Sequence, residues 1–478
     1  MTSEPGVSAK ECAWTWGFVL VLITASSLFA SIPARGLFQD GVYYLYRIAE
    51  REWFHLVDPA RTVVQVMRQA PIVLLTRFSN LSLFERGQAF SFVMLMLPAL
   101  ICLACWFLLP HGRKGWIIFP ILHLLVGISA TSFNAVGETS IATSYWWCLL
   151  FLLLFRTRDI ATQSLFLLLC ALAFYLHEGA FPLMLVLLIA CGGRLWLAQA
   201  WSERIFLAAS FLLIAAILVY ELQWVIVPRD LADRTRVLHG LATLAYVFRD
   251  GHLNLPLVTG MVACASLCGI FLLHLLLPAE RARARANTIA IGFALFAMVA
   301  IFAALVIEST FSPQAQVLAR YHPVFVSFGL GLVAVAFYFM CIPDRVWLQP
   351  ATLAVIVALG VAQTGAELVA TWRWRAYVAD LQSRLAASRG LIPWENTITT
   401  GDREKDTNWR LMSMEWVIPL MSVVFTENGV ITAIIDPRPE MTFRPLDPEK
   451  PDQFPRLRGV DFTPYRNSFA LHSPAGGQ

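Results

Sequence analysis

Long apolar runs recur along most of this chain, and they constrain its fold more than any other feature. The sequence has 478 residues, of which 58% are hydrophobic and 14% are charged. A soluble protein of this length could not keep so much apolar surface away from water, so the lipid bilayer must be part of its surroundings. One span needs about 20 apolar residues, and windows of that length predict about eleven transmembrane helices. We place them at 12–33, 88–110, 116–130, 139–155, 160–176, 180–198, 205–227, 254–277, 288–307, 322–342 and 349–370.

Basic residues fall on alternate connections between these runs, and this pattern predicts the orientation. By the positive-inside rule, loops such as the one that contains Arg281, Arg283 and Arg285 lie in the cytoplasm together with the N-terminus. An odd number of spans then puts the C-terminus outside. We therefore expect a multi-pass protein of the bacterial inner (plasma) membrane with a periplasmic C-terminus. The net charge of +4 is modest, so we expect membrane lipids and no nucleic acid among its partners.

The nine cysteines all lie in or beside apolar segments. None lies in the polar tail, so the sequence does not indicate a disulfide framework. Cys102 and Cys105 have the spacing of a metal-binding pair. However, the surrounding run is a predicted membrane helix without His, Asp or Glu, so we interpret both as packing residues.

The predicted fold class is an α-helical polytopic membrane protein with a small extracytoplasmic tail. Residues 1–370 form the transmembrane domain, and residues 371–478 form a small α+β region. The tail opens with a charged helical stretch and continues through the runs VIPLMSVVF and GVITAIIDP, which are typical of strands.

The first outer loop, residues 34–87, contains two predicted helices that lie in the membrane interface. One covers 41–54, with Trp53 and the tyrosines at the depth of the lipid headgroups. The other begins at Asp58, an expected N-cap, with Pro59 at the first helical position. Its apolar and polar residues occupy opposite faces. The apolar face has Val63, Val64 and Met67, and the polar face has Arg61, Gln65 and Arg68.

Ionisable residues at membrane depth are costly, so each one is a candidate functional residue. On the predicted topology they gather on the outer side of the membrane. The candidates are Asp40, Glu138, His177, Glu178, Glu308, Arg320, Tyr321 and His322.

Each candidate also has a purely structural explanation. Asp40 before Gly41 could be a turn or capping residue as readily as a functional one. Glu138 could cap a helix N-terminus, and His177 and Glu178 could satisfy each other or backbone groups at a helix break beside Gly179 and Pro182. Arg320 could extend to the headgroups, and Tyr321 could anchor the interface.

Their convergence on one side predicts a polar cavity at the outer leaflet. A carboxylate can accept a proton from a hydroxyl nucleophile, and an arginine binds phosphate through planar, paired donors. Aromatic residues such as Tyr145, Trp146 and Trp147 could stack on sugars or line a lipid groove. Together these residue types favour transfer of a group from a lipid-linked phosphate to a hydroxyl acceptor.

Four features make the sequence resemble the integral-membrane GT-C glycosyltransferases. These are the acid in FQDGVYYLYR after the first span, the two interfacial helices, the GET…YWW stretch and ARYHP before a late span. The resemblance covers about residues 10–370. It implies a polyprenyl-phosphate-linked sugar donor and a glycan, lipid or protein acceptor.

The same resemblance implies roles for two residues. Asp40 would be the catalytic base of an inverting single displacement, and Arg320 would bind the donor phosphate. Glu138, His177, Glu178, Tyr321 and His322 are assigned to substrate binding from the topology. Many such enzymes have a second acid in the first outer loop, but here Gln39 and Gly41 flank Asp40. We therefore expect no required cofactor, with a divalent metal as the alternative, because arginine alone can stabilise a phosphate leaving group.

Two other function classes stay open. A transporter or flippase of cell-envelope precursors would place polar residues at mid-membrane depth in broken helices. A membrane acyltransferase or glycan ligase could use His177 as its base.

Overall fold

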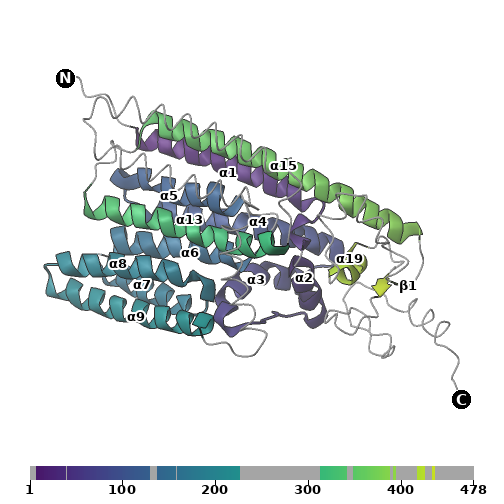
Figure 1. Cartoon of the computed structure of the whole chain (residues 1–478), viewed down its shortest axis with the longest axis horizontal. Coiled ribbons are helices and arrows are strands. Elements are labelled where there is room, and N and C mark those ends of the chain that lie inside the picture. The colour runs from purple at the N-terminus through teal and green to yellow at the C-terminus, as the bar shows by residue number, and fades with distance from the viewer. Residues whose placement is uncertain are drawn as a thin grey trace, which may run out of the picture. The chain divides into compact units, whose positions relative to one another are not determined.

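The structure is a computed structural model that divides the chain into two compact units. It describes residues 7–38, 40–129, 137–157, 159–226, 313–341, 348–387, 391–393, 417–425 and 433–435. The first unit contains Met1–Ala25, Val57–Val64 and Met96–Glu367, and the second contains Ser26–Leu56, Gln65–Leu95 and Leu368–Gln478. Figure 1 labels the helices and strands.

Six helical segments in the described residues are long and apolar enough to cross a membrane. These segments are α1 (Ala9–Ser31), α4 (Leu83–Leu108), α6 (Glu138–Phe151) with its π-helical continuation η6 (Leu152–Arg156), the turn η7 (Glu178–Ala180) with α8 (Phe181–Leu197), most of α9 (Trp201–Ile226) and most of α15 (Pro350–Ala387). Helix α7 (Ile160–Ala173) and part of α13 (Pro313–Phe339) are apolar but shorter. The chain therefore has the architecture of a helical membrane protein.

The hydropathy windows located these helices well but not their ends. The predicted span at 116–130 is a series of short pieces, namely η3 (His111–Ile117), α5 (Ile118–Leu122) and η4 (His123–Ile128). Helix α15 has 38 residues and continues past residue 370, where we expected the tail to begin. The predicted spans at 254–277 and 288–307 lie outside the described residues, and the number eleven stays a prediction.

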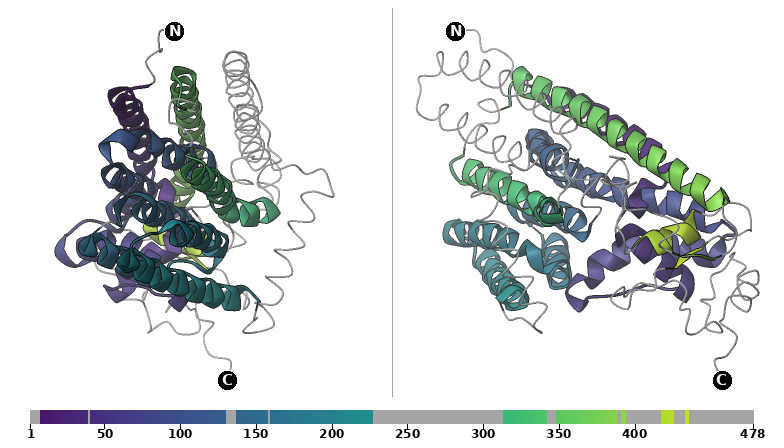
Figure 2. Two further views of the ribbon diagram at one scale, coloured as in Figure 1. Left: turned by 90° about the vertical axis from the view of Figure 1, so that its left-hand side faces the viewer. Right: turned by 45° about the vertical axis from the view of Figure 1, so that its right-hand side comes forward.

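In the first unit, the apolar helices pack closely around α6. Helices α8 and α9 lie side by side (Figure 2), and α13 packs against both α8 and α6. The indole of Trp146 on α6 donates a hydrogen bond of 2.8 Å to the carbonyl of Leu183 on α8. On α13, Gly331 permits this approach, because a Cβ at that position would lie 2.5 Å from the Trp146 ring.

The second unit contains the first outer loop. Its helix α2 (Asp40–Arg51) confirms the predicted helix at 41–54. Helix α3 (Thr62–Phe78) follows the turn η2 (Pro59–Arg61), and most of α3 belongs to this unit. Within the unit, Trp374 of α15 donates a 2.8 Å hydrogen bond to the carbonyl of Pro33.

Two expectations for the polar segments were wrong. The run VIPLMSVVF contains a buried helix, α19 (Ile418–Val424), because a short apolar run fits a buried helix as well as a strand. Gln65 and Arg68 on the polar face of α3 are buried rather than directed to water. Tyr44 and Tyr46 are buried within the second unit, and their depth in the membrane stays a prediction.

The predicted strand-like run after residue 428 contains a short strand. Strand β2 (Ala433–Ile435) pairs in parallel with β1 (Leu391–Pro393), so that Ile392 is opposite Ile434.

The packing of α4 against α6 gives a direct test of the fold. The thiol sulfurs of Cys105 and Cys148 lie 3.5 Å apart in the first unit. They need to move only about 1.5 Å to reach disulfide bonding distance. Oxidation with iodine in membranes should therefore link them, and mass spectrometry of the digested protein should detect the linked peptides. The C148S variant should lack this product, and a link from Cys105 to any other cysteine would contradict the packing.

Candidate functional site

Arg61 is the centre of a polar cluster in the first unit. It ends the turn η2, which begins after Asp58 because the Asp58 carboxylate accepts a 2.9 Å hydrogen bond from the backbone N–H of Ala60. Pro59 then occupies the first helical position, as the sequence predicted. Two residues after Arg61, the N–H of Val63 donates to the carbonyl of Tyr175 at 2.9 Å. The turn is therefore fixed beside the segment that leads into η7 (Glu178–Ala180).

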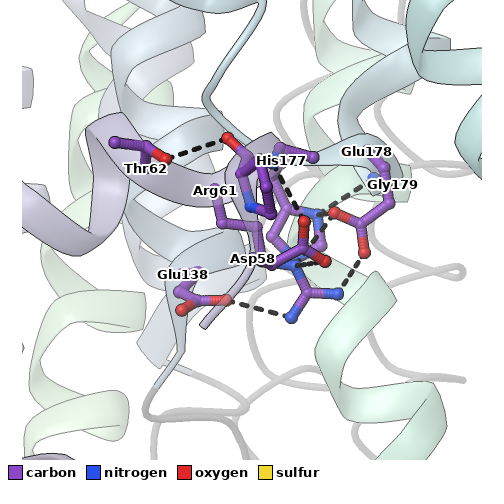
Figure 3. A network of polar contacts seen from close by, with 9 residues as sticks. Asp58, Arg61, Thr62, Glu138, His177, Glu178 and Gly179 are labelled. Carbon is purple, nitrogen blue, oxygen red and sulfur yellow. Dashed lines mark hydrogen bonds and ion pairs between the residues drawn. The ribbon is translucent and has the colours of Figure 1, made fainter. Parts of the chain in front are cut away.

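The guanidinium of Arg61 joins two acids that are far apart in the sequence (Figure 3). Its Nε donates to Glu178 at 2.9 Å, and one terminal nitrogen donates to the second oxygen of the same carboxylate. The other terminal nitrogen donates to Glu138 at 3.1 Å. A two-point arginine–carboxylate contact is among the strongest polar contacts in proteins. Asp58 adds a longer ion pair at 4.0 Å.

Glu138 and Glu178 both stand at the start of a membrane helix. Glu138 is the first residue of α6, and Glu178 opens the turn that leads into α8. Glu138 is buried, and Glu178 is partly buried. Both carboxylates are therefore fixed at the N-terminal ends of their helices, and Arg61 pairs with both of them.

His177 has a structural role in this cluster. Its Nδ1 accepts a 2.9 Å hydrogen bond from the backbone N–H of Gly179, and so the side chain caps the turn. Burial lowers the pKa of His177, against the opposing charge of Glu178. The ring is therefore neutral with its Nδ1 occupied. That arrangement confirms the structural explanation of His177.

The cluster contains more acids than bases. Burial alone would lower the pKa of Arg61, but the hydrogen bond and charge of Glu178, with Glu138 and Asp58, raise it above its ordinary value. All three guanidinium nitrogens donate to carboxylates, so Arg61 is not open to a phosphate in this arrangement. Within the described ranges, no group of three or more His, Cys, Asp or Glu side chains is arranged to hold a metal ion.

Asp40 belongs to the second unit and is held by a tight turn. It is the first residue of α2 and is partly buried. Before it, the N–H of Gly36 donates a 2.9 Å hydrogen bond to the hydroxyl of Ser91 on α4. A Cβ on Gly41 would lie 1.8 Å from the carbonyl oxygen of Gly36, so only glycine fits after Asp40. The chain therefore fixes the backbone on both sides of this carboxylate.

His55 connects α2 and α3 in the same unit. Its backbone N–H and carbonyl form a pair of hydrogen bonds with the side-chain amide of Gln69, at 2.7 and 2.9 Å. Its ring nitrogen Nε2 lies 2.9 Å from the hydroxyl of Tyr43. Burial and the charges of Arg51, Arg47 and Arg68 lower the pKa of His55 to about 4. The neutral ring is therefore part of the folded structure.

The structure brings together part of the predicted site. Glu138, His177 and Glu178 meet around Arg61, whereas Asp40 lies in the other unit. Its convergence with them stays a prediction. The sequence assigned Arg320, Tyr321 and His322 to the same cavity. These residues belong to α13, which packs against η7, but their side chains lie outside the described part of the structure.

The aromatic residues of α6 do not form a sugar-stacking surface. Trp146 and Trp147 are fully buried among helices of the first unit. The Tyr145 hydroxyl donates to the carbonyl of Leu169 at 2.9 Å. The expectation that these side chains contact a substrate was therefore wrong, because their size and shape are used in packing.

Two residues of the cluster were missed at the sequence level. Arg61 was assigned to the polar face of an amphipathic helix, and nothing in its local sequence indicates partners 77 and 117 residues away. Glu221 could have been found, because it is an acid within the apolar run of α9. It is buried, and it lies close enough to Glu178 to interact with it electrostatically.

No family model matches this chain, and neither does any curated protein or solved structure. A functional proposal therefore depends on the residues and on the geometry of the two units.

Removing Arg61 should destabilise the first unit strongly. The R61A variant would leave the carboxylates of Glu138 and Glu178 without their cation, which typically costs about 3–5 kcal/mol for a buried pair. Because Arg61 is partly exposed, we expect the lower end of this range, about 3 kcal/mol. The melting temperature in detergent micelles should fall by several degrees, whereas R113A, at an exposed position of η3, should change it little.

Neutralising Glu138 and Glu178 in the R61A variant distinguishes the effect of unpaired charge on stability from the effect of lost packing. Adding E138Q and E178Q to R61A should recover most of the lost stability, because no buried charge is then left unpaired. A triple variant that is as unstable as R61A would contradict the ion-pair account.

The pKa of His55 predicts a pH-dependent stability. The unfolded histidine titrates near pH 6.5, and the folded one near pH 4. Neutral His55 therefore makes its full contribution to the free energy of unfolding above pH 6.5. This contribution is lost as the pH falls towards 4, and the loss is at most about 3 kcal/mol. Unfolding measured by tryptophan fluorescence across this window should show the loss in the wild type.

Two variants serve as controls for this pH dependence. H55Q should flatten the decline, while H111Q at an exposed position should leave it unchanged. An equal decline in H55Q and the wild type would assign the effect to other groups.

Proposed function

We propose that this chain is a membrane glycosyltransferase with Asp40 as its general base. It transfers a sugar from a polyprenyl-phosphate-linked donor to a hydroxyl of a glycan, lipid or protein, at the outer face of a bacterial inner membrane. The main support is the position of Asp40. It lies nine residues after the end of the first candidate span and is partly buried at the start of an amphipathic helix. Gly36 and Gly41 form the turn before this helix, and Gly36 donates a hydrogen bond to Ser91 of α4. A fixed, partly buried carboxylate is what general base catalysis requires.

The charge of the second unit supports an anionic donor. The described residues of this unit contain nine arginines and five acids. The arginines are Arg35, Arg47, Arg51, Arg68, Arg77, Arg86, Arg373, Arg375 and Arg384, and the acids are Asp40, Glu50, Glu52, Glu85 and Asp380. Three of the arginines, Arg35, Arg68 and Arg86, are almost completely buried. An excess of guanidinium groups in the unit favours an anionic phosphate over a neutral ligand, because guanidinium donates in a planar fork.

The proposed reaction is a single displacement. The Asp40 carboxylate accepts the proton of the acceptor hydroxyl as its oxygen attacks the anomeric carbon of the donor sugar. The bond from that carbon to the phosphate oxygen breaks with inversion, and the polyprenyl phosphate leaves with the bonding electrons. Arginines of the unit stabilise the charge on the leaving phosphate. A divalent metal is the alternative source of this stabilisation.

The positions of the buried acids argue against a transporter. A transporter is expected to have ionisable groups near the middle of the membrane, in broken helices. Glu138 and Glu178 stand at helix starts, and Glu221 lies near the end of α9. Within the described spans, the candidate acids are thus at helix ends, which suits an enzyme that works at one face.

The D40N variant should lose sugar transfer. Asparagine keeps the shape of the side chain but cannot accept the proton, so the rate should fall by about 10²–10⁴-fold. The assay supplies undecaprenyl-phosphate-linked sugars to purified protein in liposomes with a membrane extract as acceptor, and it measures covalent transfer. E52Q changes an exposed acid of the same loop and should retain the wild-type rate.

Expression and membrane insertion of D40N should match the wild type, so that a lost rate reports on chemistry. Wild-type turnover in D40N would remove Asp40 from the mechanism. Uptake of the lipid-linked sugar into sealed vesicles without a covalent product would favour a flippase instead.

A further inference from the structure

Glu221 is a buried acid that the Arg61 cluster does not neutralise. It lies near the C-terminal end of α9, and only 2% of its surface is exposed. Neither carboxyl oxygen has a hydrogen-bond partner among the residues that the structure describes. Leaving a buried polar group unpaired costs free energy, so such a group indicates a missing partner.

Glu221 lies next to the acids that Arg61 binds. Helix α9 packs against η7, the turn that begins at Glu178. The Glu221 and Glu178 carboxyls are close enough to interact electrostatically, and two negative charges repel each other. Glu221 therefore adds a further acid to this end of the first unit.

No cation pairs with Glu221 among the residues that the structure describes. Arg61 pairs with Glu178, Glu138 and Asp58 instead, and Glu178 repels a negative charge on Glu221. His177 adds no positive charge, because its Nδ1 accepts a hydrogen bond from Gly179. Uncompensated charge is expensive away from water. A positively charged partner would therefore be bound strongly here.

We propose that Glu221, together with Glu178, binds the ammonium group of an amino sugar. An ammonium group is compact and has three N–H donors, which match the unpaired oxygens of Glu221. Within the described part of the chain, no group of His, Cys, Asp or Glu side chains has the arrangement of a metal site. Two carboxyls suit a monovalent donor of this kind.

This inference rests on the proposed function in one respect. The proposed glycosyl transfer is the reason why we assign the amine to a sugar, either the donor sugar or the acceptor. The charge argument itself needs only a ligand that contains a primary amine. A binding measurement without turnover therefore tests it separately from the transfer assay of D40N.

The test uses three sugars that differ at one position. Full-length protein in detergent is heated at slightly acid pH with glucosamine, N-acetylglucosamine or glucose, each over a concentration series. Glucosamine alone should raise the melting temperature, because only its charged amine binds to the carboxyls of the folded state. The dependence of the shift on concentration gives an apparent affinity.

Variants then assign the effect to Glu221. E221Q keeps the volume and removes the charge, and it should weaken the apparent glucosamine affinity by about 30-fold or more. E203Q is the matched control, because Glu203 lies on the same helix but pairs with Arg194 at its other end. It should respond to glucosamine as the wild type does.

Three results would overturn the proposal. One is an equal response of the wild type to all three sugars, and another is no response to any of them. The third is a response of E221Q equal to that of the wild type. The first comparison uses the wild type alone, so it holds even if E221Q does not fold.

Discussion

The ion pairs of Arg61 are the interaction on which the first unit depends most. One guanidinium joins the turn after Asp58 to the starts of two membrane helices, at Glu138 and Glu178. The net free energy of such a buried group can be small, because three charges lose their water. Its effect on specificity is larger, since any other position of the turn would leave buried charges unpaired. The segment Val57–Val64 accordingly belongs to the first unit, although the loop residues on both sides of it belong to the second.

Charged residues gather differently in the two units. In the second unit, arginines outnumber acids around the fixed Asp40 turn, and three of them are almost completely buried. In the first unit, acids outnumber the arginine around η7. The proposed transfer depends on the arginine-rich second unit, whereas the proposed amine site depends on acids of the first unit.

The sequence predicted well what depends on local pattern. Hydropathy located the helices, and the Asp58-Pro59 pair identified the start of η2 because capping is decided within a few residues. The sequence-based predictions were wrong where tertiary packing determines the surroundings of a side chain. Trp146 and Trp147 were predicted to bind a ligand, but they are buried in the core. The partners of Arg61 could not be predicted, because no local pattern specifies a contact across 117 residues. The charge argument did identify Glu138 and Glu178, and the same argument applied to α9 would have added Glu221.

The long sequence distance between Arg61 and its acids has a consequence for biogenesis. Arg61 is synthesised first, Glu138 follows 77 residues later and Glu178 a further 40 residues later. At a synthesis rate of about 5–20 residues per second, Glu178 is made roughly 6–23 s after Arg61. During this time water or lipid headgroups must solvate the arginine. The turn can dock only when the start of α8 has been made, so the ribosome and the insertion machinery set the order in which this part of the protein assembles.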